Sequence, residues 1–198
     1  MYIDGKKFTT VEEFYPQGLS CLPRDKMWGE FFLAGTAGAY CSGKDEMIRL
    51  VGDLMKGNRY LEIGTFDGVI LSCLAQLYPG KEFHAIDIFK AGEATNSGCL
   101  KYFIDNNSRF DNVYLYIGTS VEVKDQLEGQ FDLILIDGNH SYEWVKIDIQ
   151  TMRPFVRIGG VMVFHDYDNK NVRRAIDEEV NNLEAYKKGE FHYARRIQ

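Results

Sequence analysis

The sequence predicts one doubly wound α/β domain built on a mostly parallel, Rossmann-like sheet. From residue 59 onward, five short runs of β-branched or aromatic residues alternate with segments of helical periodicity, as in βαβ units. The chain has 198 residues, 45% of them apolar and 26% charged, which suits one domain with its own core. Polar residues or glycine follow each predicted strand, as at the ligand-binding edge of such a sheet.

The first βα unit has clear boundaries. A strand at residues 59–63 ends at Gly64, and a helix at residues 69–78 ends at the stop signal Pro79-Gly80. The residues before this unit show no clear period over most of their length, so no strand is predicted there. A helix does precede the unit, because apolar residues recur at helical spacing at Met47, Leu50, Val51 and Leu54.

The second and third strands are predicted at residues 82–88 and 113–117. A weaker helix is predicted between them, because two apolar residues follow a third at distances of three and four positions, which places all three on one helical face. These residues are Leu100, Phe103 and Ile104. The third strand ends at Gly118-Thr119-Ser120.

The fourth strand, at residues 131–136, is an almost unbroken apolar run, as expected of a central strand covered on both faces. Ser141 is predicted to cap the helix that follows. The inward-facing residues of that helix are Val145, Ile149 and Met152. A fifth strand is predicted at residues 161–164, directly after a pair of glycines.

The C-terminal part adds one helix and one strand. Asn171 is predicted to cap the helix, whose inward-facing residues are Val172, Ala175, Ile176 and Val180. A strand is predicted at residues 191–197, so the sheet has strand order 3-2-1-4-5 with a C-terminal strand added. Residues 45–198 form the predicted domain and residues 1–44 an N-terminal extension. Its aromatic residues either form a lid over a substrate or pack against the sheet: Trp28, Phe31, Phe32 and Tyr40.

Composition and charge point to a small molecule as the partner. The formal net charge of −6 argues against a general affinity for nucleic acid, because phosphate binding needs a surplus of Lys and Arg on one face. We expect no membrane anchor and no secretory signal, since no segment has the required apolar length. The four cysteines include no C-x-x-C pair, which fits a cytoplasmic protein without disulfides or zinc. A homo-oligomer is compatible with all of these features.

Glycine and acidic residues at two strand ends predict a site for an adenosine cofactor. Gly64 and Gly68 let a ligand approach the backbone where the next helix starts. Asp87 lies about 20 residues further on, where a carboxylate can accept hydrogen bonds from both ribose hydroxyls. NAD and FAD are disfavoured, because Phe66 stands where a dinucleotide fingerprint has its second glycine.

These residues resemble motifs of the class I S-adenosylmethionine-dependent methyltransferases. Glu62-Ile-Gly64-Thr-Phe-Asp-Gly68 looks like their first motif, and Asp87 looks like their ribose-binding acid. The resemblance implies that the methionine part of S-adenosylmethionine lies over Gly64, the ribose on Asp87 and the adenine near Ile88, Thr119 and Ser120. The cofactor-binding residues that it implies are Glu62, Gly64, Thr65, Gly68, Asp87, Ile88, Thr119, Ser120 and Asp137.

A closer resemblance is to the macrocin and cephalosporin-type O-methyltransferases of antibiotic pathways. It rests on Asp137-Gly-Asn-His140 and on the run from Gly159 to Asp166. It implies methylation of a small-molecule hydroxyl, such as that of a sugar or natural product, with His140 as catalytic base and Asp137 beside it. In that group, the aspartate that matches Asp137 and an acidic pair after the fifth strand hold magnesium. In this sequence the corresponding pair is His165-Asp166.

The histidine changes the expected metal. A site of Asp137, His165 and Asp166 would suit a softer divalent ion than magnesium, such as manganese, iron or zinc, and a metal-free enzyme is the alternative.

Three other functions remain as alternatives. An NAD-dependent oxidoreductase is opposed by Phe66. A metal-dependent hydrolase built on Asp137, His140 and the His165-Asp166 pair needs no adenosine ligand, and it leaves the acids of the cofactor motifs without a role. A binding protein that kept the fold and lost turnover is the third.

Overall fold

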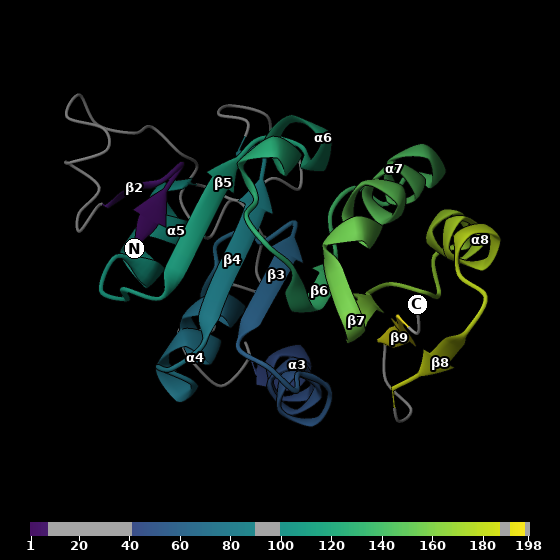
Figure 1. Cartoon of the computed structure of the whole chain (residues 1–198), viewed down its shortest axis with the longest axis horizontal. Coiled ribbons are helices and arrows are strands. Elements are labelled where there is room, and N and C mark those ends of the chain that lie inside the picture. The colour runs from purple at the N-terminus through teal and green to yellow at the C-terminus, as the bar shows by residue number, and fades with distance from the viewer. Residues whose placement is uncertain (8–40, 90–99, 187–190, 197–198) are drawn as a thin grey trace, which may run out of the picture.

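The computed structural model describes residues 1–7, 41–89, 100–186 and 191–196, which form one nine-stranded sheet with helices on both faces (Figure 1). The strand order is β2-β1-β5-β4-β3-β6-β7-β9-β8. The five predicted strands are β3 to β7, and all pair in parallel, so the predicted order 3-2-1-4-5 is confirmed. The strands are β1 (Tyr2–Ile3), β2 (Lys6–Lys7), β3 (Arg59–Ile63), β4 (Glu82–Asp87), β5 (Val113–Ile117), β6 (Phe131–Ile136), β7 (Val156–Phe164), β8 (Leu183–Ala185) and β9 (His192–Arg195).

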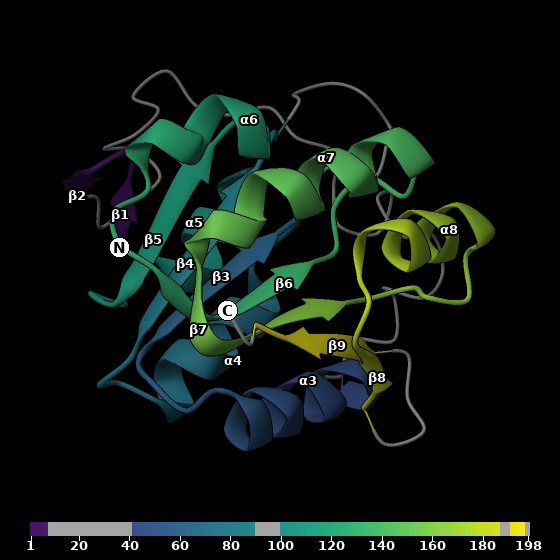
Figure 2. The ribbon, with the colours of Figure 1, turned by 45° about the vertical axis from the view of Figure 1, so that its right-hand side comes forward.

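The helices divide into two layers (Figure 2). Helices α3, α4 and α5 pack on one face of the sheet, and α6, α7 and α8 pack on the other. Since β3 to β7 are parallel, the segments that follow them all lie at one edge of the sheet. The helices are α3 (Cys41–Leu54), α4 (Val69–Leu77), α5 (Leu100–Asn107), α6 (Ser120–Val123), α7 (Tyr142–Met152) and α8 (Lys170–Glu179), with single 3-10 turns at Lys124–Gln126 and Arg153–Phe155.

The position of strand β6 between two helical layers explains why its sequence is almost wholly apolar. All of its residues are buried, with Leu133 and Leu135 facing the core under α3 to α5. Ile134 and Ile136 face the opposite core, under α6 to α8. Burying such a side chain stabilises a protein by roughly 1.5–3 kcal/mol, so this one strand joins both layers.

Two short N-terminal strands are absent from the sequence-based prediction. β1 pairs in parallel with β5, and β2 turns back antiparallel to β1. Ile3 is buried, and the ring of Tyr2 stacks on that of Tyr114 with 5.0 Å between the ring centroids. A strand of two residues is too short to show alternation, which explains why no pattern revealed it.

The C-terminal end differs from the prediction in two respects. The cap of α8 is Asn169, whose side chain accepts a hydrogen bond from the backbone N–H of Asn171, so the predicted cap at Asn171 is wrong. The predicted last strand is β9, but β8 pairs with it antiparallel, so a hairpin and not a single strand extends the sheet. β8 reads Leu-Glu-Ala and lacks the β-branched and aromatic residues that indicate a strand.

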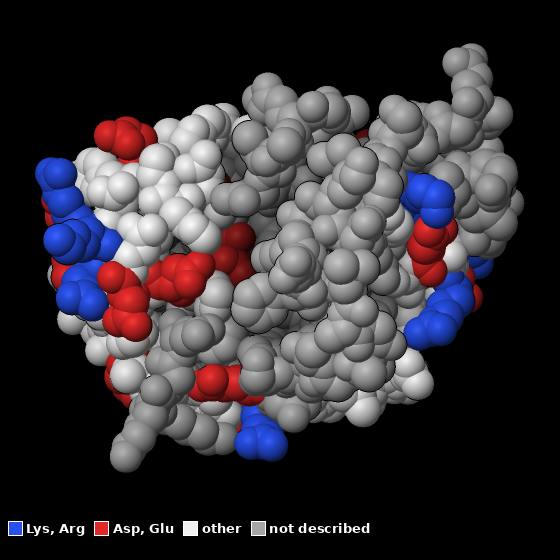
Figure 3. All heavy atoms as spheres, turned by 180° about the vertical axis from the view of Figure 1, so that it is seen from behind, with Lys and Arg blue, Asp and Glu red and all other residues white. Residues whose placement is uncertain are grey.

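None of the helices in the described ranges is long and apolar enough to cross a membrane. On the face seen in Figure 3, basic side chains lie in separate groups with acidic side chains beside them.

Asp132 ties together the amino-terminal ends of three strands. Its side chain, which is 9% exposed, accepts a 2.9 Å hydrogen bond from the backbone N–H of Arg59 at the start of β3. It also forms an ion pair with Arg157 of β7. Arg157 is 38% exposed, so water compensates part of its charge when the acid is changed, but the buried contacts of Asp132 are weakened.

We expect Asp132→Asn to lower the free energy of unfolding by about 1–3 kcal/mol, because Arg157 loses its charged partner. The matched control is Asp125→Asn, whose side chain is 84% exposed and should change the same quantity by less than about 0.5 kcal/mol. Urea unfolding followed by circular dichroism measures both variants. Equal effects would show that Asp132 ties nothing together.

Candidate functional site

The turn between β3 and α4 is packed so tightly that two of its residues have to be glycine. Gly64 has φ +84°, and a Cβ there would lie 2.1 Å from the carbonyl oxygen of Asp137. Gly68 has φ +66°, and a Cβ there would lie 2.4 Å from the ring of Phe103. The chain's own packing therefore requires both glycines, whatever ligand lies at the start of α4.

Asp87 joins this turn to the end of β4. One carboxylate oxygen accepts a 2.9 Å hydrogen bond from the backbone N–H of Phe66, and the other accepts a 3.0 Å bond from the N–H of Phe89. Both phenylalanines have positive φ, of 56° and 38°, which is uncommon for residues with a side chain and clusters at functional sites. Burial raises the pKa of Asp87 to about 6, although the backbone hydrogen bonds lower it.

Glu62 adds a second buried acid to the same region. It is 2% exposed, and the hydroxyl of Thr65 donates a 3.5 Å hydrogen bond to it. Burial raises the pKa of Glu62 well above its usual range, and the nearby carboxylates of Asp137 and Asp87 raise it further. Three strand ends thus bring three predicted site residues within electrostatic reach of one another.

The predicted adenine-contacting residues lie at the ends of β4 and β5. Ile88 is 40% exposed although its neighbours Asp87 and Phe89 are buried, so an apolar side chain is available to a ligand there. Thr119 caps α6 in a capping box with Glu122. These side chains follow adjacent strands, which places them on one side of the site.

Asp148 is a residue of this region that the sequence analysis missed. It lies on α7 and is 4% exposed, and it accepts a 2.6 Å hydrogen bond from the hydroxyl of Ser120. Burial raises the pKa of Asp148 to about 6, against the effect of that hydrogen bond. The available signal was a charged residue beside Ile149 on a helical face that otherwise reads as apolar.

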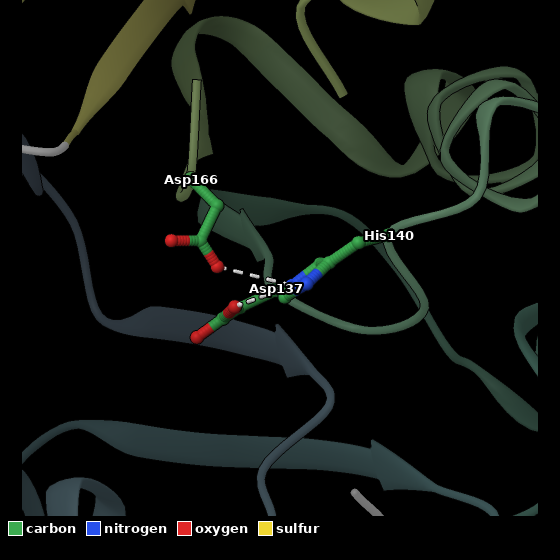
Figure 4. Close-up of side chains that lie close together, drawn as sticks. All are labelled: Asp137, His140 and Asp166. Atoms are coloured by element: carbon green, nitrogen blue, oxygen red, sulfur yellow. Dashed lines mark ion pairs between the residues drawn. The ribbon is translucent and has the colours of Figure 1, made fainter. Parts of the chain in front are cut away.

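Two aspartates and two histidines form a second cluster at the ends of β6 and β7, and Figure 4 shows three of these residues, Asp137, His140 and Asp166. Nε2 of His140 lies 3.1 Å from Oδ2 of Asp166 and 3.6 Å from Oδ1 of Asp137. Nδ1 of His165 lies 3.1 Å from the same two oxygens. Asp166 has φ +54°, so the backbone is strained where it turns its carboxylate toward the cluster.

The carboxylates favour a positive charge on both imidazoles. Burial alone would lower the pKa of His165, but the hydrogen bonds to Asp137 and Asp166 outweigh it and raise the pKa to about 11. The contact with Asp137 raises the pKa of His140, and burial opposes this. The hydrogen bond from His165 lowers the pKa of Asp166.

The cluster has the donors that a divalent cation needs. Ligand atoms of Asp137, His140 and Asp166 lie within 4.8 Å of one another. Nε2 of His140 is buried and makes no hydrogen bond of good geometry, although both carboxylates lie near it. Two carboxylate oxygens and an imidazole nitrogen suit manganese, iron or zinc better than magnesium, so these residues fit such an ion. The predicted third ligand His165 also contacts both carboxylates.

Three solved methyltransferases have folds similar to this one. The O-methyltransferase NovP superposes with a TM-score of 0.62 at 11% identity, over 77% of this chain and 80% of NovP. CalS11, a TDP-rhamnose 3'-O-methyltransferase of calicheamicin biosynthesis, gives 0.60 at 17% identity, over 89% and 88%. TomG of Streptomyces achromogenes, an O-methyltransferase solved with S-adenosylmethionine, gives 0.57 at 17% identity, over 79% and 80%. At these identities the likeness concerns the fold.

Sequence comparison identifies the family. An uncharacterized protein of Acanthamoeba polyphaga mimivirus is 30% identical over 142 residues, which is 68% of this chain and 64% of that protein. This chain therefore spans about two thirds of that relative's length. The family described as a methyltransferase domain matches residues 61–167, more than half of the 198 residues. The chain belongs to this family, the class I S-adenosylmethionine-dependent methyltransferases.

Proposed function

We propose that this protein transfers a methyl group from S-adenosylmethionine to a hydroxyl group of a small molecule. The observation that carries the proposal is Asp87, a buried acid fixed by hydrogen bonds beside the Gly64 turn. The O-methyltransferases NovP, CalS11 and TomG, which share the fold, support the choice of a hydroxyl. When bound, the cofactor supplies a methyl group already activated by its positively charged sulfur.

The ribose of the cofactor is proposed to bind Asp87. Each oxygen of this carboxylate accepts one backbone hydrogen bond and keeps a lone pair for a ribose hydroxyl. The methionine part would lie over Gly64, where the acids at the strand ends suit its positive charge, and the adenine would pack on Ile88. The proposed cofactor-binding residues are Glu62, Gly64, Thr65, Gly68, Asp87, Ile88, Thr119, Ser120 and Asp137.

His140 is the proposed base that removes the acceptor's proton. It can do so only as the neutral imidazole, and a cation held by Asp137 and Asp166 would oppose the positive charge that these carboxylates otherwise favour on it. Its side chain is 40% exposed against 22% for His165, so an acceptor reaches His140 more easily. With His140 as the base, the proposed ligands of a divalent cation are Asp137, His165 and Asp166, and such an ion would lower the pKa of an acceptor hydroxyl. His140, whose Nε2 lies beside both carboxylates, is the alternative third ligand. The MycE methyltransferase, solved with Mg and S-adenosylhomocysteine, has a similar fold, with a TM-score of 0.55 at 16% identity.

The proposed catalytic domain spans residues 45–198, and residues 1–44 are the proposed N-terminal extension. The aromatic residues predicted either to form a lid or to pack on the sheet lie outside the described residues. They are Trp28, Phe31, Phe32 and Tyr40.

Calorimetry with S-adenosylhomocysteine tests the proposed function. We expect binding to the wild-type protein and an affinity about 10- to 100-fold lower for Asp87→Ala, because hydrogen bonds to a charged group contribute about 1.5–3 kcal/mol. Asp125→Ala, which changes an exposed acid, should bind like the wild type. Binding of NADH in place of S-adenosylhomocysteine would favour an oxidoreductase, and binding of a metal but neither nucleotide nor nucleoside would favour a hydrolase.

The pKa of Asp87, raised by burial to about 6, predicts that binding depends on pH. Only the ionised carboxylate accepts hydrogen bonds from both ribose hydroxyls, so binding favours the ionised form. Affinity for S-adenosylhomocysteine should therefore rise from pH 5 to pH 7, by at most about tenfold per pH unit below the pKa. Calorimetry at pH 5, 6 and 7 measures this. Asp87→Asn should bind more weakly with less dependence on pH, and a flat wild-type profile would rule out the ionised acid as the ribose ligand.

Manganese binding, followed by the electron paramagnetic resonance of the free ion, tests the proposed ligands. We expect Asp137→Asn and Asp166→Asn to weaken binding at least about tenfold, because each removes a charged oxygen ligand. His165→Ala should weaken it similarly, and His140→Ala should change it little. The opposite result for the two histidines would make His140 the ligand, and four unchanged affinities would exclude a cation at this cluster.

A further inference from the structure

The proposed methyl transfer gives the buried acid Asp148 no direct role. It lies on the inward face of α7 among apolar residues, and burial raises its pKa to about 6. A carboxyl group at such a position is unfavourable for folding, and a neutral side chain of similar size would be less costly. Its presence therefore calls for a reason other than stability.

Asp148 lies beside two loops. One of its oxygens accepts the 2.6 Å hydrogen bond from Ser120, which is 2% exposed at the start of α6. The other lies 3.6 Å from the position that a Cβ on Gly138 would take, so the carboxyl group lies next to the loop after β6. One carboxyl group is therefore bonded to the loop after β5 and adjacent to the loop after β6.

These loops carry the two ends of the proposed site. Ser120 lies where adenine is proposed to bind, and the backbone N–H of Gly118 donates a 2.9 Å hydrogen bond to the carbonyl oxygen of Asp87. Gly138 directly follows Asp137 and lies two residues before His140. Asp148 thus lies between the proposed ribose and adenine side of the site and the proposed acid–base side.

We propose that Asp148 is a positioning residue that fixes the loop after β5 relative to the loop after β6. It acts through Ser120 and Gly138 and does not touch the reacting atoms. Small errors in the alignment of two reactants lower the rate of methyl transfer strongly, so a fixed distance between the two ends of the site matters. This inference rests on the proposed function, because it takes the loop after β5 as the cofactor loop.

Calorimetry with S-adenosylhomocysteine gives the first test. We expect Asp148→Ala to lower the affinity about tenfold, because the loosened loop after β5 has to be ordered again when the ligand binds. Asp148→Asn keeps an acceptor oxygen for Ser120 and should retain most of the affinity. The double variant Ser120→Ala, Asp148→Ala should bind S-adenosylhomocysteine no more weakly than the weaker-binding of the two single variants. Each single substitution already removes the hydrogen bond between Ser120 and Asp148.

The matched control is Asp132→Asn, which changes a buried acid at the opposite edge of the sheet. It should lower stability without changing the affinity for S-adenosylhomocysteine, provided that all variants are folded at the temperature used. A purely structural role for Asp148 would give the same result as this control and would overturn the inference.

Amide hydrogen exchange without cofactor gives the second test. In Asp148→Ala, exchange should accelerate in residues 118–122 and in residues 137–141, because both loops lose their shared contact. The same residues should be unaffected in Asp132→Asn, and unchanged exchange in Asp148→Ala would overturn the inference. If the wild type and Asp148→Ala bind S-adenosylhomocysteine with the same affinity, the inference about Asp148 is wrong and the proposed function stands. If the wild-type protein binds no S-adenosylhomocysteine, the proposed function is wrong, and the inference about Asp148 fails with it.

Discussion

The close passage of β3 beside β6 at the carboxyl edge of the sheet is the constraint on which the site depends. Gly64 lies so close to the backbone of Asp137 that no side chain fits between them. The N–H of Asp137 donates a 3.0 Å hydrogen bond to β3, and the N–H of Gly64 donates a 2.9 Å bond to β4. These bonds extend both ladders past the strand ends. As a result, the carboxylates of Asp87 and Asp137 lie near enough to Glu62 to raise its pKa. Asp137 also contacts His140 and His165 of the second cluster.

The acidic residues at the two edges of the sheet have different kinds of partner. At the amino edge, Asp132 is paired with Arg157. At the carboxyl edge, among the described residues, Glu62 and Asp87 have hydroxyl and backbone N–H partners, and Asp137 has the two histidines. An acid paired with arginine contributes to the fold. Glu62 and Asp87 have no cationic partner among the described residues and so keep an attraction for a positively charged ligand, which agrees with their proposed role in binding.

Local patterns predict the parallel core and the strand ends, because these depend on residues that are neighbours in the sequence. The pattern does not predict which partners meet across the sheet. It places Asp137, His140 and Asp166 at one edge, but their distances follow from the strained backbone at Asp166. It also cannot choose between Asn169 and Asn171 as a cap, since both have the same propensity. β8 and the Ser120 contact of Asp148 depend wholly on distant partners.

Burial of Asp87 and Asp148 links binding to folding. Both have a pKa raised to about 6 from 3.8, so the folded chain binds more protons than the unfolded chain between those pH values. The contribution of these groups to stability therefore falls as pH rises through that window, and the loss persists at neutral pH, where both are ionised. A ligand that donates hydrogen bonds to Asp87 favours its ionised form and offsets part of this loss. Burying these two acids thus lowers the stability of the free protein at neutral pH. The stabilisation on binding to the proposed site should be largest at a pH where Asp87 is already ionised.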